Sequence, residues 1–506
     1  MAALQIVVAL ILSTLPITPH ATNITRQSPV RPNILFAIAD DWSWPHAGAY
    51  GDKVVKTPTF DRVAREGVLF TNVFCASPSC TPSRGAILTG RPIHQLEEGG
   101  NLWSILPKKF ATYPDILEAA GYAVGFTRKG WSPGSLEGSG RTRNPAGPQY
   151  KDFATFRASV KPDQPWCFWF GSTDPHRPYV RGSGAASGMN PADVIVPPYL
   201  PDTPEVRNDL LDYYFAVYRY DRDVGEILKQ LEANGGLDNT IVVMTGDNGL
   251  PFPRAKTNLY DAGCHLPLAI RWPAKVKSGR VRNDLISFTD FAPTLLDAAG
   301  LKYPPEMTGK SFLDALVPSS KATPFVGNLR TFRAPGQDLV FHMEAAVFLE
   351  RERHANVRKG DLSYPCRAVR TKQFLYIRNF RPDRWPAGDP EMYRAVGPFG
   401  DIDPGPSKSV ILDRRSDPAI APFFKLACAK RPAEELYDVR KDPWDLKNLA
   451  DDSNYTTEKK KLRSMLDQWM KDTDDPRAAN DDDRWDKYPY VGPPAAMPDR
   501  KIETAK

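Results

Sequence analysis

The chain has 506 residues, of which 41% are hydrophobic and 25% are charged. This balance is typical of a globular protein, and the length predicts a large α/β domain with a smaller companion. The net charge of +6 is mildly basic and lacks a Lys/Arg block. It therefore argues against a nucleic-acid partner and suits an anionic substrate. Six cysteines in this length exclude a disulfide-dense scaffold and leave room for few internal pairs.

The N-terminal stretch is apolar. Residues 2–19 carry no charge, and polar sequence begins at His20. The stretch is short for a membrane span and resembles a secretory signal cleaved near Ala21, so we predict a signal peptide over residues 1–21. No other long apolar run follows. We therefore expect a secreted or periplasmic protein, lysosomal in a eukaryote, without a stable membrane anchor.

Strand and helix patterns alternate after this stretch. Continuous apolar runs predict strands buried on both faces at residues 33–39, 166–171 and 240–245. Amphipathic patterns predict helices at residues 58–67, 113–120 and 205–234. Such alternation predicts parallel crossovers, hence an open α/β sheet with its site at the carboxyl ends of the strands.

The pattern changes near Pro365. Residues 367–379 alternate like an exposed antiparallel strand, residues 382–406 are loop-rich, and residues 458–471 predict a closing helix. We therefore divide the mature chain into a main domain over residues 31–365 and a C-terminal α+β subdomain over residues 366–506.

Oxygen-bearing side chains follow two of the predicted strands in pairs. Asp40 and Asp41 follow the first strand, and Asp247 and Asn248 follow the third. Three carboxylates and an amide that converge at strand ends would suit Ca²⁺ or Mg²⁺. The alternatives are helix or turn capping for the first pair and a tight turn for the second.

The run from Cys80 to Gly90, CTPSRGAILTG, predicts a short helix entered from a loop. Pro82 suits the first turn, and Gly90 suits the position just past the end. Cys80 would lie at the helix N-terminus, which favours a bound anion, and Arg84 one turn later could contact a tetrahedral oxyanion. The alternative is a buried cysteine before an ordinary helix.

The same run, Cys-Thr-Pro-Ser-Arg followed by Leu-Thr-Gly, resembles the signature of the type I sulfatases. In that family the formylglycine-generating enzyme oxidises the cysteine to formylglycine, whose aldehyde hydrate is the nucleophile. The order of the two oxygen-ligand pairs around this motif also matches the family. The resemblance implies one divalent ion, usually Ca²⁺, held by Asp40, Asp41, the modified Cys80, Asp247 and Asn248.

Three basic side chains fall on positions that match the family. They are Lys129, His176 in the run DPHRP, and Lys256 in the run RAKTNLY. The resemblance implies that they and Arg84 contact sulfate, and that His176 or Lys256 protonates the leaving group. The alternatives are a solvated lysine and a hydrogen-bonded loop histidine.

Trp131 departs from the family pattern, which usually has a histidine at this position to assist the release of sulfate. Tryptophan cannot accept that proton. His94 is the nearest replacement along the chain, and His46, His265 and His354 are further candidates.

Two longer stretches, residues 193–208 and 247–260, resemble the heparan N-sulfatase (sulfamidase) branch, although that branch tends to have arginine at position 256. Residues 435–450 resemble the family's C-terminal subdomain. The implied fold is an alkaline-phosphatase-like sandwich with a mostly parallel central sheet and a small antiparallel sheet. The charged run Glu350–His354 could reach the pocket rim or be a solvated surface.

We therefore expect a sulfatase that releases sulfate from a sulfated carbohydrate, either N-sulfoglucosamine or a sugar O-sulfate. The alternatives are a phosphonate or phosphodiester hydrolase of the same superfamily, and a non-catalytic binder of sulfated polysaccharide.

Overall fold

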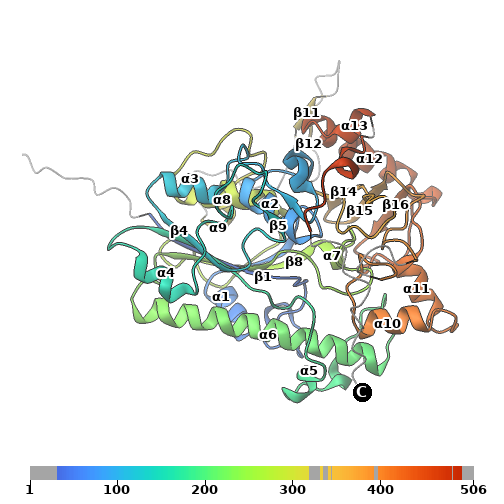
Figure 1. Cartoon of the computed structure of the whole chain (residues 1–506), viewed down its shortest axis with the longest axis horizontal. Helices are drawn as coiled ribbons and strands as arrows, with labels where there is room; N and C mark the ends of the chain where they lie inside the picture. Colours follow the sequence, from blue (N-terminus) through green and yellow to red (C-terminus); the bar gives the residue numbers. More distant parts are fainter. Residues whose placement is uncertain are drawn as a thin grey trace, which may run out of the picture. The chain divides into compact units, whose positions relative to one another are not determined.

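A mixed, mostly parallel sheet forms the centre of the computed structural model (Figure 1). The structure describes residues 31–317, 345–391, 397–480 and 482–492, and the backbone of residues 331–333 and 340–342. The predicted signal peptide lies outside the described residues. Among the described residues, no helix has the length and apolar character needed to cross a membrane.

The central sheet has the strand order β10-β2-β8-β7-β1-β6-β4, with β9 paired to β2, within the described residues. Its strands are β1 (Asn33–Ala39), β2 (Val68–Phe74), β4 (Ala123–Arg128), β6 (Trp166–Gly171), β7 (Thr240–Gly246), β8 (His265–Arg271), β9 (Arg280–Arg282) and β10 (Ile286–Ser287). β1 pairs in parallel with β6 and β7, whereas β8 runs antiparallel to β7 and β2. The predicted class of fold is confirmed.

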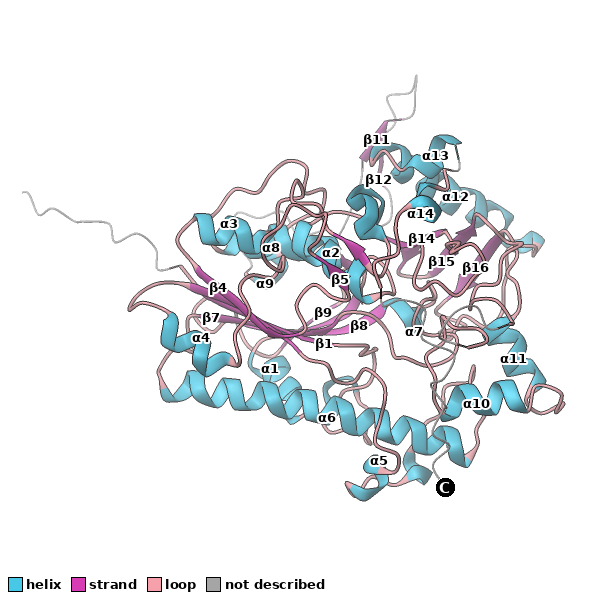
Figure 2. Cartoon of the chain, viewed as in Figure 1, coloured by secondary structure: helices cyan, strands magenta, loops and turns pink. Residues whose placement is uncertain are grey.

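Helices cover both faces of this sheet (Figure 2). On one face lie α2 (Cys80–Thr89), α3 (Tyr113–Ala119) and α8 (Phe291–Ala298). On the other face lie α1 (Pro58–Glu66), α4 (Phe153–Ser159) and α6 (Pro204–Ala233). Side chains of β1 alternate between the two apolar cores, with Phe36 in the first and Leu35 in the second. This double burial explains the continuous apolar runs in the sequence.

The register of the sheet brings the two oxygen-ligand pairs together. Ala39 at the end of β1 lies opposite Gly246 at the end of β7 in a parallel ladder. The residues that follow, Asp40 and Asp247, therefore leave the sheet side by side.

A separate antiparallel sheet is formed later in the chain. Its strands, in order, are β13 (Ala346–Arg351), β14 (Cys366–Thr371), β15 (Phe374–Asn379) and β16 (Glu434–Asp438). The helix α12 (Thr456–Asp472) packs on one face, where Trp469 stacks on Phe348 with ring centroids 4.6 Å apart. The opposite face contributes Leu349 and Leu375 to the core of the main sheet.

One predicted element is wrong in detail. Residues 367–379, expected to form one exposed strand, form the hairpin of β14 and β15, and both strands are buried. Their alternating arginines face buried carboxylates rather than water: Arg367 pairs with Asp475 at 2.6 Å, and Arg370 with Asp261 at 2.8 Å.

The remaining elements are short or lie at the surface. The strands are β3 (Ser104–Ile105), β5 (Gly134–Ser135), β11 (Thr331–Arg333) and β12 (Val340–His342). The helices are α5 (Ser183–Ala186), α7 (Asp261–Cys264), α9 (Leu313–Leu316), α10 (Pro406–Asp413), α11 (Ala421–Cys428), α13 (Pro476–Asn480) and α14 (Arg484–Lys487). The 3₁₀ turns are Gly48–Tyr50, Ile93–Gly100, Pro191–Asp193, Phe288–Asp290 and Ser453–Tyr455.

All six cysteines lie in the described part of the chain, and each is a buried free thiol. The predicted division into residues 31–365 and 366–506 stays a prediction.

The stack of Trp469 on Phe348 should hold α12 on the antiparallel sheet. We expect Trp469→Ala to lower the free energy of unfolding by about 3 kcal/mol or more, because it removes a large buried ring and leaves a cavity. Urea unfolding followed by circular dichroism measures this loss. Trp469→Phe keeps a ring in the stack and should lose clearly less; equal losses in the two variants would contradict this account.

Candidate active site

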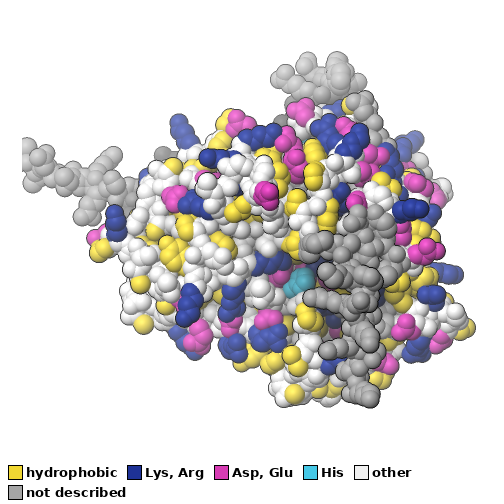
Figure 3. Space-filling model, viewed as in Figure 1, with side chains coloured by type: hydrophobic (Ala, Val, Ile, Leu, Met, Phe, Trp, Pro, Cys, Tyr) yellow, Lys and Arg dark blue, Asp and Glu magenta, His cyan; other side chains and the backbone are white. Residues whose placement is uncertain are grey.

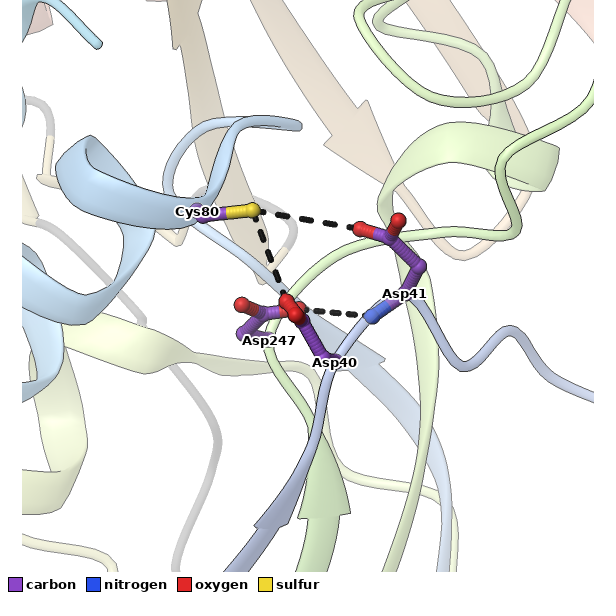
Figure 4. A group of neighbouring side chains, drawn as sticks. All are labelled: Asp40, Asp41, Cys80 and Asp247. Carbon is purple, nitrogen blue, oxygen red and sulfur yellow. Dashed lines mark hydrogen bonds between the residues drawn. The ribbon is translucent and has the colours of Figure 1, made fainter. Parts of the chain in front are cut away.

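Four side chains meet where β1 and β7 end and α2 begins (Figure 4). They are Asp40 and Asp41 after β1, Asp247 after β7, and Cys80 as the first residue of α2. The Cys80 Sγ atom lies 3.5 Å from Asp40 Oδ1 and 3.9 Å from Asp41 Oδ1. All four are buried, and one potential ligand atom from each lies within 4.8 Å of the others.

The backbone at Asp41 turns sharply to make this arrangement. Its φ angle is 74°, in the left-handed region that few residues other than glycine, Asn and Asp adopt. In this conformation the Asp41 N–H donates to Asp247 Oδ1 at 2.9 Å. That bond links the two strand ends and fixes the relative positions of their carboxylates.

The donor set fits a hard cation. The Asn248 Nδ2 group donates to Asp41 Oδ1 at 2.6 Å, but its buried Oδ1 atom has no hydrogen-bond partner among the described residues. A buried carbonyl oxygen without a partner, beside three carboxylates, is the environment that Ca²⁺ prefers. The role of these residues as metal ligands stays a prediction.

Each of the three carboxylates already contacts a cationic side chain. Lys129 Nζ lies 2.6 and 2.7 Å from the oxygens of Asp40. Lys256 Nζ lies 2.7 Å from Asp41 Oδ2, and Arg84 Nε lies 2.8 Å from Asp247 Oδ2.

These contacts do not stabilise the charged forms of Asp40 and Asp41 equally. Burial by itself would raise the pKa of Asp40, but Lys129 and other nearby cations outweigh it, so that pKa is lowered. At Asp41, burial prevails over Lys256 and raises the pKa. One carboxylate of the cluster therefore lacks sufficient positive charge, which an additional cation would supply.

Burial also raises the pKa of the Cys80 thiol well above its ordinary value. An unmodified Cys80 is therefore a neutral thiol at neutral pH. Since only the thiolate is a strong nucleophile, the geometry does not suit catalysis by this sulfur atom itself.

His176 approaches the cluster from the loop after β6. Its Nε2 atom lies 3.9 Å from Asp41 Oδ2, and its side chain is 36% exposed. The next residue, Arg177, makes two 2.8 Å hydrogen bonds to Asp209 of α6 and lies over the rings of Tyr179 and Phe252. This buried pair fixes the loop that presents His176.

A cavity of about 530 Å³ opens over this cluster. That volume is typical of a site for a small molecule. Its lining includes the predicted residues Asp40, Cys80, Lys129, His176 and Lys256. On the face drawn in Figure 3, Lys and Arg side chains are interspersed with Asp and Glu.

Trp103 and Asp403 are among the lining residues that the sequence did not predict. Trp103 follows the turn Ile93–Gly100, and Asp403 lies in the loop before α10. Asp403 Oδ2 is 3.1 Å from Lys256 Nζ. Neither residue belongs to a motif, and only long-range packing brings them here.

Trp131 does not line the cavity. It is buried, and its ring packs so tightly over Gly134 that a Cβ atom there would lie 2.5 Å from the ring. At the position where the family usually has a histidine, this chain therefore has a Trp131 ring that belongs to the core. It supplies no proton acceptor to the site.

Of the four histidines considered as replacements, all of them in the described part of the chain, His354 lines the cavity and the others do not. His94 contacts Glu350 and the Thr473 carbonyl. His46 contacts Tyr213, and His265 stacks between Trp44 and Phe74.

His354 Nδ1 lies 2.8 Å from the hydroxyl of Ser79, the residue before Cys80. Burial lowers the pKa of His354 to about 3, so its imidazole is neutral at neutral pH. A pKa this low makes His354 a weak base, so it would accept a proton only where charge in the bound complex raises that pKa.

The rest of the run Glu350–His354 is buried rather than solvated. Glu352 pairs with Arg477 at 2.8 Å, and Arg351 pairs with Asp401 at 2.6 Å. The solvated alternative is wrong, and the run reaches the cavity through His354.

Comparisons with known proteins identify the family of the chain. The sequence model of the family described as Sulfatase matches residues 32–301, more than half of the chain. An N-sulphoglucosamine sulphohydrolase of Homo sapiens is 29% identical over 88% of this chain and 91% of its own length. An ulvan-active sulfatase of Formosa agariphila is 29% identical over 87% of this chain and 75% of its own length.

Solved structures share the fold. One, in complex with its substrate D-glucosamine-2-N,6-O-disulfate, superposes with a TM-score of 0.61 at 20% identity, covering 89% of this chain and all of its own. Another, a 2-O GAG sulfatase, has a TM-score of 0.59 at 19% identity and covers 92% of this chain and 99% of its own. The expected sulfatase-type sandwich is confirmed.

The Asn248 oxygen allows a direct test of the cation site. We expect Asn248→Ala to lower Ca²⁺ affinity by about tenfold to a hundredfold, because the variant loses one ligand oxygen. Calorimetric titration with calcium measures the change. Asn208→Ala, at a half-buried position on α6, should bind calcium like the wild type. Unchanged affinity in Asn248→Ala would contradict the assignment.

Proposed function

Because the chain belongs to the sulfatase family, we propose that it hydrolyses the sulfate group of a sulfated sugar in this cavity. The observation that carries the proposal is the convergence on Cys80 of three buried carboxylates and the cations Arg84, Lys129 and Lys256. Such a site can bind a hard cation and a tetrahedral anion next to one another. We also propose that the protein is exported, which the uncharged apolar run at residues 2–19 supports.

The buried, neutral Cys80 thiol supports a modified nucleophile. We propose that a formylglycine-generating enzyme converts Cys80 to formylglycine, whose hydrate supplies an oxygen nucleophile at the N-terminus of α2. The helix N-terminus favours the negative charge that develops there.

The proposed metal is one Ca²⁺ ion. Its ligands would be the side chain at position 80 together with Asp40, Asp41, Asp247 and Asn248. When bound, the ion acts as a Lewis acid that polarises a sulfate oxygen.

The chain's own cations complete the anion site. The Arg84 Nη2 atom is buried without a hydrogen-bond partner among the described residues and lies 3.7 Å from Asp40 Oδ1, so it adds positive charge beneath the anion site. Burial by itself would lower the pKa of Lys129, but Asp40 outweighs it and raises that pKa. Lys129 therefore stays protonated and keeps its charge for the substrate.

His176 is better suited than Lys256 to protonate the leaving group. Burial by itself would lower the pKa of Lys256, but Asp403 and Asp41 raise it well above the ordinary value. Lys256 therefore holds its proton too strongly for transfer near neutral pH, which leaves His176, 36% exposed beside Asp41, as the proposed donor.

The leading substrate is N-sulfoglucosamine. The activity in the name of the human relative supports it, and sugar O-sulfates are the second candidate. The test is a panel of N-sulfo, 6-O-sulfo and 2-O-sulfo sugars with assay of released sulfate. Activity confined to O-sulfated sugars would exclude the sulfamidase assignment and keep the sulfatase one.

Two rival functions are tested with further ligands beside this panel. Faster hydrolysis of phosphonates or phosphodiesters than of sulfates would identify the superfamily alternative. The protein for the second test is made in a host that has the maturing enzyme. If it binds sulfated polysaccharide tightly but does not hydrolyse it, the protein is a non-catalytic binder.

Cys80→Ala should abolish turnover and leave the fold intact, because alanine cannot be converted to an aldehyde and its methyl group fits the buried position. Sulfate release and thermal unfolding are measured together. The mass of the tryptic peptide that contains residue 80 identifies formylglycine in the wild type. Wild-type rates in Cys80→Ala would rule out a nucleophile at this position.

His354→Gln should lower kcat by about tenfold to a thousandfold with little change in KM, if His354 Nε2 accepts a proton in the site that lacks a histidine at position 131. Glutamine can keep the hydrogen bond to Ser79 but cannot accept that proton. His94→Gln, remote from the cavity, is the matched control. An unchanged kcat in His354→Gln would exclude this role.

A further inference from the structure

The cavity has two unlike walls. The strand ends and α2 supply Asp40, Cys80 and Lys129, which belong to the proposed reaction. The rest of the lining includes Trp103, His354, Ala355, Gly400 and Asp403, of which only His354 has a part in the proposed reaction. Asp403 lies beside the centre, with a carboxylate oxygen within 4.8 Å of side-chain atoms of Asp41 and His176.

This second wall is held by hydrogen bonds between distant segments. The Leu102 N–H donates to the Arg353 carbonyl at 2.9 Å, and the Arg353 N–H donates to Asn101 Oδ1 at 3.0 Å. These bonds join the backbone segments that carry Trp103 and His354, both of which line the cavity. The half-buried indole of Trp103 thus offers an apolar surface to the cavity.

The loop that carries Asp403 is equally fixed. Its neighbour Asp401 is buried between Arg351 and Arg358, each 2.6 Å away. Lys408 Nζ donates to the carbonyls of Phe399 and Ile402 at 3.1 and 2.7 Å. The carboxylate of Asp403 is therefore preorganised and not a mobile surface group.

Asp403 is unexpected in a pocket for an anion. It lies outside the proposed metal set, and its one ion-pair partner among the described residues is Lys256, which also contacts Asp41. By contrast Asp174, the other acidic residue of the rim, makes two hydrogen bonds to Arg219. The small residues Ala355 and Gly400 leave space for a substrate beside Asp403.

A carboxylate and an aromatic ring on one wall are suited to a sugar. The carboxylate accepts hydrogen bonds from hydroxyl or ammonium groups, and the ring packs against the C–H face of a pyranose. A carboxylate on the substrate would instead lie close to the carboxylate of Asp403. The two like charges would repel each other, because little water would separate them.

We propose that Asp403 selects the sugar: the wall of Trp103 and Asp403 accepts a sulfated sugar with hydroxyl or ammonium donors and rejects a sulfated uronic acid. This inference rests on the proposed function, since it assumes that the sulfate group occupies the site of Cys80 and Lys129. Lys256 then bridges the chemical and the recognition parts of the cavity.

The experiment compares glucosamine 6-sulfate, galactose 6-sulfate and a 2-O-sulfated hexuronate. Their binding to the thiol form of the protein, made without the maturing enzyme, is measured by calorimetry, and kcat/KM is measured with the matured form. We expect the wild type to favour the two hexose sulfates by about a hundredfold. Asp403→Asn should reduce that ratio at least about tenfold, because it keeps the shape and removes the charge.

Trp103→Ala is the matched variant on the same wall. It should weaken binding of all three sugars by a similar factor and leave their ratio unchanged, since stacking does not depend on the substrate's charge.

Three results would overturn the proposal. One is equal wild-type affinity for the hexuronate and the hexose sulfates. Another is a uniform loss for all substrates in Asp403→Asn, which would make Asp403 only the counter-ion of Lys256. The third is full affinity in Trp103→Ala. The protein could also bind the hexose sulfates selectively and yet hydrolyse none of them. That result would contradict the proposed function but support the selection of the sugar by Asp403.

Discussion

The structure depends on the need to balance three carboxylates buried within a few ångströms of one another. Removing such charges from water is costly unless cations lie close to them. The chain supplies one cation for each carboxylate: Lys129 for Asp40, Lys256 for Asp41 and Arg84 for Asp247. These cations come from the loop after β4, the loop after β7 and the helix α2. The same constraint thus fixes the relative positions of three elements, and a divalent ion would further stabilise the ionised carboxylates.

A second layer of buried ion pairs supports this centre. Arg177 joins the loop after β6 to Asp209 of α6, and Ser407 of α10 donates to the same carboxylate at 2.6 Å. Arg367 joins the antiparallel sheet to Asp475. These pairs bring little net stability by themselves, but breaking one would leave a buried charge without a partner. These ion pairs fix the relative positions of segments that are far apart in the sequence.

The elements that could be predicted from the sequence are those specified by local patterns. The strand at residues 33–39 and the long helix at 205–234 agree with β1 and α6 to within a residue, because double burial and amphipathic spacing leave a clear periodicity. The two oxygen-ligand pairs could be located because polar residues directly follow apolar strands. Alternation alone could not reveal that the arginines of β14 face buried carboxylates, because the sequence of a solvated strand looks the same. Asp403 was not predictable either, since its place depends on Asp401, Arg351 and Arg358 coming together across the fold.

The wall formed by Trp103 and Asp403 separates two tasks within one cavity. The groups around Cys80 come from strand ends and one helix, whereas Asp403 comes from a loop fixed by its own arginine pair and Lys408. The two parts meet at Lys256, which contacts both Asp41 and Asp403, so a change in this loop would have to keep a partner for that lysine. Exchanging residues 397–405 between relatives would then transfer substrate preference without disturbing the nucleophile, which is how one scaffold can serve a family of differently decorated polysaccharides.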